Sequence, residues 1–271
     1  MTKDPSTGLV VSGGLQRQFL SRMPALLEQL GPVKASSFRV ARQIANTLHA
    51  GYAISHYSAL EACKLIWIAV PETTLERVVR DLTAQMPVHR TMVVLCNMAR
   101  DSSWPNALRA AGARMATVNQ VGEGRESVLM GEGHADTLRA ARKVLGPAQH
   151  RFVEIRPYTK AIYFAGISLS TQLLLPWIDA STGCLRAAGL ARSQATELVA
   201  SLSAKIMRAY ASGGQKAWNR GAEAALHKSA NRDAERLASI DPRLGQLYGE
   251  GVRLALAHFG GAPGSKRSGQ P

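Results

Sequence analysis

Residues 65–70, LIWIAV, decide the fold of this chain, because an uninterrupted apolar run is typical of a strand buried on both faces of a parallel sheet. Pro71 follows the run, and residues 73–86 then place Leu75, Val78, Val79 and Leu82 on one helical face. A buried strand that leads into an amphipathic helix is the repeating unit of a doubly wound α/β domain, which is the fold class that we predict.

The same alternation extends to both sides of this unit. The predicted strands are short and apolar, and they lie at 33–36, 52–55, 65–70, 91–96, 114–118, 127–131 and 151–155. The predicted helices between them lie at 37–50, 73–86 and 135–145. A further helix is predicted at 15–30, and we expect residues 1–14 to be flexible. The predicted α/β domain therefore covers residues 1–157.

A second domain follows, because the strand signals stop after residue 157. Its predicted helices lie at 158–179, 181–189, 192–212, 215–239 and 241–259. The third helix carries an apolar stripe formed by Leu198, Val199, Leu202, Ile206, Met207 and Tyr210. We predict an all-α domain over 158–260, and a disordered tail over 261–271, which is rich in Gly, Pro and Ser.

Composition narrows the class of protein. The 271 residues are 46 % hydrophobic and 19 % charged, as in globular proteins, and the net charge is +14. The basic residues are spread along the chain, which disfavours a nucleic-acid partner; steep salt dependence of binding would argue for one. Three distant cysteines and a start without signal-peptide features favour the cytoplasm. The histidines show no metal-ligand spacing, so we expect no metal.

The most apolar stretch, residues 161–178, is nearly long enough to span a membrane. It carries Ser168, Ser170, Thr171, Gln172 and Pro176, however. We therefore predict a buried helix of the helical domain and no membrane partner.

The stretch SSFRVA, residues 36–41, lies between a predicted strand and a predicted helix. Dinucleotide-binding proteins carry G-x-G-x-x-G between their first strand and first helix. In this register Ser36, Phe38 and Ala41 take the glycine positions. Alanine is tolerated at the third position, whereas the side chain of Phe38 would fill space that the pyrophosphate needs.

Other functions remain open for the same stretch. Ser36, Ser37 and Arg39 could bind a smaller anion at the helix N-terminus. Alternatively, a serine merely caps the helix and Phe38 packs in the core. The end of the next predicted strand, residues 55–57, supplies neither an acidic side chain for a ribose hydroxyl nor an arginine for a 2′-phosphate. Together these features argue against tight binding of NADP or NAD.

Three stretches carry a family resemblance. SSFRVA keeps Arg39 and Val40 of a loop that reads G-A-G-R-V-G. LIWIAVPETTLERVV, 65–79, is similar to a strand that ends in V-P-D and its following helix, and KAIYFAGISLSTQLL, 160–174, keeps Lys160 and Tyr163 of K-x-x-Y-H-A-A. Over residues 30–259 the chain resembles Rossmann-like oxidoreductases with a helical domain of the 6-phosphogluconate dehydrogenase type, and most closely the group called domain of unknown function 2520.

The resemblance implies an NADP or NAD cofactor, a small-molecule ligand and a homodimer formed through the helical domain. The implied cofactor-binding residues are Ser36, Ser37, Phe38, Arg39, Val40, Ala41, Val70 and Pro71. Lys160 and Tyr163 are the candidate catalytic residues, because residues three apart share a helix face and a lysine here can assist proton transfer; a solvated lysine and a packed tyrosine are the alternative.

Two functions remain open at this point. The first is a divergent NAD(P)-dependent oxidoreductase with an altered glycine loop and an undetermined substrate. The second is a non-catalytic descendant that acts as a binding module or dimeric scaffold. The second is favoured by changes such as Phe164 in place of the family's histidine, since a phenyl ring transfers no proton.

Overall fold

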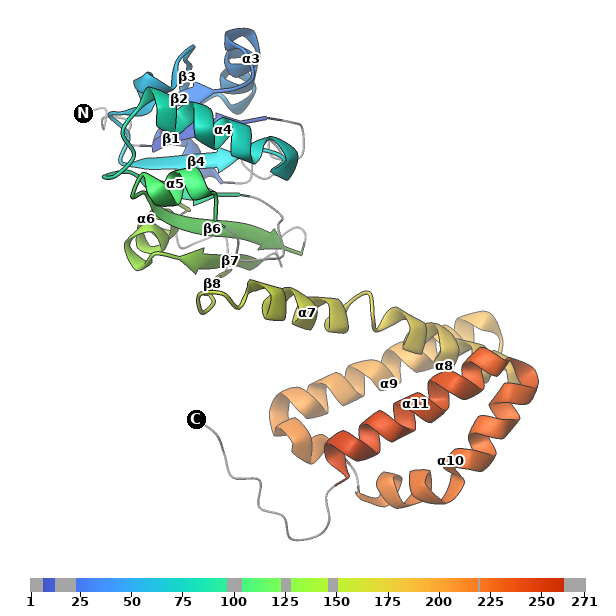
Figure 1. The fold of residues 1–271 in the computed structure, drawn as a ribbon. Coiled ribbons are helices and arrows are strands. Elements are labelled where there is room, and N and C mark those ends of the chain that lie inside the picture. The colour runs from blue at the N-terminus through green and yellow to red at the C-terminus, as the bar shows by residue number, and fades with distance from the viewer. Residues whose placement is uncertain are drawn as a thin grey trace. The chain divides into compact units, whose positions relative to one another are not determined.

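A computed structural model describes residues 7–12, 23–96, 104–122, 128–145, 151–218 and 220–260. The chain forms two compact units that divide between Gly166 and Ile167 (Figure 1). The boundary predicted at residue 157 precedes helix α7 (Lys160–Ser170), whereas the units divide within this helix. The predicted tail, 261–271, lies outside the described residues.

Unit 1 is built on one sheet in which strands follow the order β3-β2-β1-β4-β5-β6-β7-β8. The strands are β1 (Thr7–Val11), β2 (Leu30–Lys34), β3 (Tyr52–Ala53), β4 (Leu65–Ala69), β5 (Met92–Leu95), β6 (Arg114–Val121), β7 (Val128–Gly133) and β8 (Arg151–Glu154). Neighbouring strands from β3 to β6 are parallel, β7 is antiparallel to β6, and β8 is parallel to β7. The Rossmann-like α/β fold is therefore confirmed, with two added strands of opposite direction at one edge.

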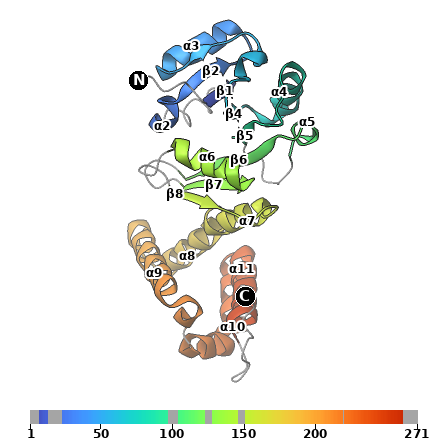
Figure 2. The same cartoon turned by 90° about the vertical axis from the view of Figure 1, so that its left-hand side faces the viewer.

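Helices cover both faces of this sheet (Figure 2). They are α2 (Pro24–Leu27), α3 (Phe38–Leu48), α4 (Glu72–Gln85), α5 (Asn106–Ala110), α6 (Ala135–Leu145) and the 3₁₀ helix η1 (Tyr57–Leu60). One apolar core joins the sheet to α2, α3 and α6, and a second joins it to η1, α4 and α5. Trp67 faces the first core and Ile68 the second, so β4 is buried on both faces as predicted.

The central strand β1 corrects the prediction for the N-terminus. Residues 7–11 were expected to belong to a flexible segment, yet they are fully buried and pair with both β2 and β4. Gly8 lies close to the side chains of Leu60 and Cys63, and this packing only becomes visible in three dimensions. The predicted helix at 15–30 is represented among the described residues by the short α2, and β2 begins at Leu30.

Unit 2 is helical, as predicted. Its helices are α8 (Leu175–Ala187), α9 (Arg192–Gly213), α10 (Arg220–Ile240) and α11 (Pro242–Phe259), with a short 3₁₀ turn at Gly214–Ala217. The carboxylate of Asp241 accepts a hydrogen bond from the backbone N–H of Arg243 at 2.8 Å, which caps α11 next to Pro242. Helices α10 and α11 are antiparallel neighbours, and they approach closely at Gly245, where an added Cβ would lie 2.6 Å from Ala238.

The predicted burial in the helical unit is wrong for the single chain. Among the described residues of unit 2, the buried ones are Ala195, Val199, Gly245 and Val252. In the predicted stripe on α9 only Val199 is buried. The stretch 161–178 forms parts of α7 and α8, which are separated by a turn at 171–174, and Leu169, Leu173 and Leu175 are exposed.

Residues Lys160–Ala187 form the one stretch of the described chain that is long and apolar enough to cross a membrane, as judged by length and composition. Exposed apolar surfaces of this kind are typical of interaction sites.

Candidate functional site

A cavity of about 260 Å³ opens at the edge of the sheet where the parallel strands end, which we call the carboxyl edge. The ends of β1, β2 and β4 border the cavity, and α4 and the segment before η1 complete it. Its lining residues are Val10, Val11, Ser12, Lys34, Ala35, Ser36, Ser55, His56, Tyr57, Val70, Thr74, Arg77, Val78, Asp81 and Gln85. The strand order reverses between β1 and β4, so the cavity lies at the topological switch point, where open α/β sheets bind ligands.

Polar contacts fix the walls of this cavity. The Lys34 ammonium donates to the carbonyl oxygen of Ala35 at 2.7 Å and lies 5.1 Å from the centre of the Tyr57 ring. The backbone N–H of Tyr57 donates to the Gln85 side-chain oxygen at 3.0 Å. Burial raises the pKa of the Tyr57 phenol and Asp81 raises it further, whereas Arg77 lowers it. The phenol therefore stays protonated at neutral pH and can donate a hydrogen bond.

The topology corrects the placement of residues 36–41. They follow β2, which is the second strand outward from the switch point, and not the central β1. The sequence position that corresponds to the glycine fingerprint comes after β1 and reads SGG, 12–14; residues 13–22 lie outside the described residues. The prediction was wrong by one strand because β1 was taken for a flexible segment. The replaced glycines at 36–41 therefore carry no information about the pyrophosphate loop.

The predicted residues of this stretch have different environments. Ser36 lines the cavity, and the Ser37 hydroxyl caps α3 by accepting a hydrogen bond from the backbone N–H of Val40 at 3.2 Å. Phe38 is half exposed, so the alternative that it packs in the core is wrong. Ala41 is fully buried in the apolar core that joins α3 to the sheet.

Two of these residues, on α3, lie outside the cavity. Arg39 borders a shallow surface groove on α3 together with Arg42 and His49, and Val40 packs against the core. The end of β2 thus presents serine hydroxyls and arginine side chains at the position that contacts the adenosine ribose in Rossmann folds.

The predicted residues after β4 lie beside the same cavity. Val70 is buried and lines it. Pro71 precedes α4, and its carbonyl oxygen accepts a hydrogen bond from the Thr74 hydroxyl at 3.0 Å; Thr74 also lines the cavity. The structure thus brings Ser36 and Val70 to one cavity although they are distant in sequence.

The candidate catalytic residues lie in the first turns of α7, apart from the cavity. Lys160 is fully buried and Tyr163 is partly buried, and the Tyr163 ring contacts the Phe164 ring edge-on at 5.7 Å. Burial raises the pKa of the Tyr163 phenol. Burial also raises the pKa of the Cys96 thiol, and the charge of Lys160 offsets part of this effect. Lys160 is therefore near the end of β5, which is on the carboxyl edge.

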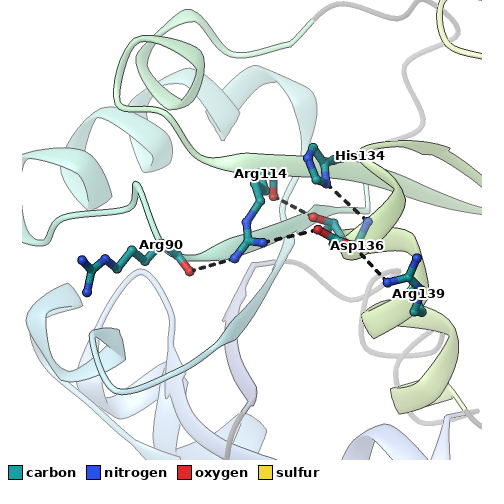
Figure 3. Close-up of polar contacts among 6 residues, drawn as sticks. Arg90, Arg114, His134, Asp136 and Arg139 are labelled. Atoms are coloured by element: carbon teal, nitrogen blue, oxygen red, sulfur yellow. Dashed lines mark hydrogen bonds and ion pairs between the residues drawn. The ribbon is translucent and has the colours of Figure 1, made fainter.

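The opposite edge of unit 1 carries an exposed ionic cluster (Figure 3). Asp136 accepts a hydrogen bond from Arg139 at 3.0 Å and lies 3.5 Å from the Arg114 guanidinium, which also reaches the carbonyl oxygen of Arg90. His134 Nδ1 accepts from the backbone N–H of Asp136. These side chains are largely exposed, so each pair contributes at most about 1 kcal/mol. We assign them to anchoring α6 and not to ligand binding.

Several polar residues of the cavity were not predicted from the sequence, namely Lys34, Arg77, Asp81 and Gln85. Arg77, Asp81 and Gln85 are spaced by four along α4 and so share a helix face, which is a signal that the sequence contained. No group of three potential metal ligands lies together within the described ranges.

Comparisons with known proteins identify the fold. No family model matches the chain, and no curated protein matches it. Among solved structures, a protein from Bacteroides fragilis that is described as a proposed NADP oxidoreductase aligns with a TM-score of 0.72 and 13% identity, over 93% of this chain and 97% of that chain. A protein from Thermotoga maritima aligns with a TM-score of 0.65 and 15% identity, over 94% and 98%.

An imine reductase from Myxococcus stipitatus in complex with NADP+ aligns with a TM-score of 0.58 and 13% identity, over 94% of this chain and 95% of that chain. The structural neighbours thus include NAD(P)-dependent oxidoreductases with a Rossmann-like fold and a helical C-terminal region. At these identities the similarity concerns the fold.

Proposed function

We propose that this protein is an NAD(P)-dependent oxidoreductase that reduces a small carbonyl or imine compound. The observation that carries the proposal is the cavity at the switch point, which the ends of β1, β2 and β4 form together. In this fold the crevice at that point is where dinucleotides bind. The similarity in fold to an imine reductase that binds NADP+ gives further support.

The cavity fits one nucleoside half of such a cofactor. Its volume of about 260 Å³ is near the lower end of the range for small-molecule sites, and it offers hydroxyl and ammonium donors from Ser36 and Lys34. Ser36 and Ser37 would face the adenosine ribose, and Arg39 and Arg42 on α3 would supply positive charge for a 2′-phosphate. This arrangement favours NADP over NAD, since the described end of β2 has no carboxylate for the ribose hydroxyls.

The other half of an extended dinucleotide would lie toward β5, because β1 and β5 are two strands apart, or about 10 Å. Lys160 is near the end of β5. A reduced nicotinamide supplies a hydride, and the reduction also needs a proton on the substrate oxygen or nitrogen. Lys160 and Tyr163 are the residues that we propose for holding and delivering this proton.

A non-catalytic binding module is the second candidate, and one observation favours it. Lys160 is fully buried and Phe164 is nearly so, so neither side chain reaches solvent in this conformation. A protein that binds a nucleotide without turning it over would fit this arrangement. The two candidates share the cavity and differ in whether the cofactor is consumed.

We further propose that the protein is a homodimer that associates through unit 2. Leu202, Ile206, Met207 and Tyr210 on α9 are all more than half exposed, and the leucines of α7 and α8 extend the apolar surface. Burying such side chains favours association, and the hydrophobic gain of about 25 cal/mol per Å² is partly offset by the entropy that association costs. The three cysteines are free thiols, which favours a reducing compartment such as the cytoplasm.

Fluorescence titration with NADPH and NADH tests the first step of the proposal. We expect NADPH to bind at least about tenfold more tightly than NADH, and the Arg39→Ala/Arg42→Ala double variant to remove this preference. A matched variant, Arg90→Ala, lies at the opposite edge and should leave binding unchanged. Absence of any signal at millimolar NADPH would contradict cofactor binding. NADPH consumption with small imines and ketones then separates the oxidoreductase from the binding module.

A further inference from the structure

Two charged side chains stand out in unit 1 because they are fully buried. Among the described residues, Glu132 on β7 and Lys160 on α7 are the charged residues in this class. Burying a charge is costly unless hydrogen bonds or opposite charges compensate it, and glutamate and lysine are rarely buried for this reason. The two side chains belong to elements that meet at the start of α7.

A hydrogen bond shows how Glu132 acts on this turn. Its carboxylate oxygen Oε1 accepts from the backbone N–H of Tyr158, two residues before Lys160. Tyr158 has φ of 64°, in the left-handed region that a tyrosine rarely adopts, and its own side chain is exposed. The side chain of Tyr158 therefore does not explain its backbone conformation, whereas the hydrogen bond to Glu132 stabilises it.

The helix continues directly from this turn. The Thr159 hydroxyl and its N–H both donate to the carbonyl oxygen of Arg156, and the N–H of Tyr163 donates to the carbonyl oxygen of Thr159. The Glu132 carboxylate thus lies at the N-terminus of α7, where a negative charge is also favoured by the helix dipole. Both effects fix the direction in which the first turn presents Lys160.

The strand register places Glu132 in line with the carboxyl edge near β5. Glu132 on β7 is paired with Thr117 on β6, and Thr117 is paired with Leu95, the residue before Cys96. Paired residues share a face of the sheet, so Leu95, Thr117 and Glu132 form one row across three strands. Lys160 acts electrostatically on Cys96, which follows Leu95 at the end of β5 and packs against the core on the other face of the sheet.

We propose that Glu132 is the positioning residue for Lys160. Through Tyr158 it sets the turn that begins α7, and its buried charge favours the ammonium form of Lys160 at the end of β5. The assignment of Lys160 as proton donor rests on the proposed function, whereas the positioning by Glu132 rests on the contacts above.

Amine labelling of the full-length protein, read by peptide mass spectrometry, tests the positioning without requiring activity. Lys160 should react at least about tenfold more slowly than the exposed Lys143. Glu132→Ala removes both the acceptor and the charge, and Glu132→Gln keeps an oxygen for Tyr158 and removes the charge only. Both should increase the labelling of Lys160 about tenfold, because the neutral, reactive amine becomes more populated. Lys143 should be unaffected.

Glu154→Gln is the matched control, since Glu154 lies on the neighbouring β8 and pairs with Arg142 at the surface. It should leave the labelling of Lys160 unchanged. If Glu132→Ala does not fold, as judged by circular dichroism, Glu132→Gln decides the question. Unchanged labelling of Lys160 in a folded Glu132→Gln protein would overturn the proposal.

Kinetics then link the positioning to the proposed function. With a substrate that the wild type reduces, Glu132→Gln should lower kcat about tenfold and leave the KM for NADPH within about twofold, because the cofactor cavity is not touched. A raised KM with unchanged kcat would contradict the positioning of a proton donor. If the wild type reduces nothing, the oxidoreductase proposal fails, and the labelling rates still decide the role of Glu132.

Discussion

The two units of this protein differ in how completely they bury their apolar side chains. In unit 1, side chains from both faces of the sheet form two dry cores, and the strands β1 and β4 are buried at every position. In unit 2, four helices bury only a handful of side chains among the described residues, and large apolar groups remain exposed. Unit 1 therefore buries its apolar side chains within one chain, whereas unit 2 leaves large apolar side chains exposed, as interaction surfaces typically do.

The largest expected effect concerns the core of unit 1. Trp67 is fully buried among apolar side chains, so Trp67→Ala should lower the free energy of unfolding by about 3–5 kcal/mol. Leu202→Ala in unit 2 should cost less than about 0.5 kcal/mol wherever the chain is monomeric. Urea unfolding at several protein concentrations measures both. A change in the free energy of unfolding as small for Trp67→Ala as for Leu202→Ala would contradict the difference in burial between the two units.

The next effect concerns the exposed stripe on α9. Ile206→Glu should dissociate the proposed dimer and raise its Kd about 30- to 150-fold, since a charge in an apolar contact costs about 2–3 kcal/mol. Light scattering after size-exclusion chromatography reports the mass of the particle. Arg39→Glu, on the surface of unit 1, is the matched control.

Two other results would contradict the proposal that a second copy of the chain covers the apolar stripe on α9. A wild-type chain that stays monomeric at micromolar concentration has no self-association to disrupt. Binding of the wild type to phospholipid vesicles, lost in Ile206→Glu, would assign the stripe to a lipid surface instead.

One pH effect should come from a buried thiol of unit 1. Burial raises the pKa of Cys63 to about 11 in the folded state, from 9.0. The neutral thiol is thus favoured by folding, and the corresponding stability is complete below about pH 9 and is lost as the pH rises toward 11. We expect the difference in stability between wild type and Cys63→Ala to shrink by about 1–2 kcal/mol over this range, as measured by urea unfolding. A constant difference would contradict the burial of this thiol.

The last comparison concerns two glycines on α11. An added Cβ at Gly249 meets no atom within 4 Å, so Gly249→Ala should stabilise unit 2 by about 0.5–1 kcal/mol. At Gly245 the Cβ would lie 2.6 Å from Ala238, so Gly245→Ala should destabilise it by about 1–3 kcal/mol. Thermal unfolding measures both changes. Destabilisation at Gly249 would instead indicate that another chain packs closely there.

Sequence patterns located most elements of unit 1 because burial leaves a periodic trace. β4 and α4 were predicted to within one or two residues, since a continuous apolar run and a helical period are each visible in a short window. β1 was missed because TGLVV is short and is flanked by Ser and Gly, which resemble a loop. Without β1, residues 36–41 would follow the first strand of the sheet, whereas they follow the second. The absence of glycines there was therefore wrongly interpreted as a change in the pyrophosphate loop.

The sequence by itself determined the fold class and the order of the two parts, because both follow from local periodicity. The candidates Ser36, Val70, Lys160 and Tyr163 came from the resemblance of short motifs to a known family. Only the tertiary structure decided which strand is central, and hence that residues 36–41 follow β2 and border a cavity with β4. Only the tertiary structure placed the Glu132 carboxylate at the start of α7 and left the α9 stripe exposed. Contacts between residues far apart in the chain depend on strand order and register, which leave no mark in any single window of sequence.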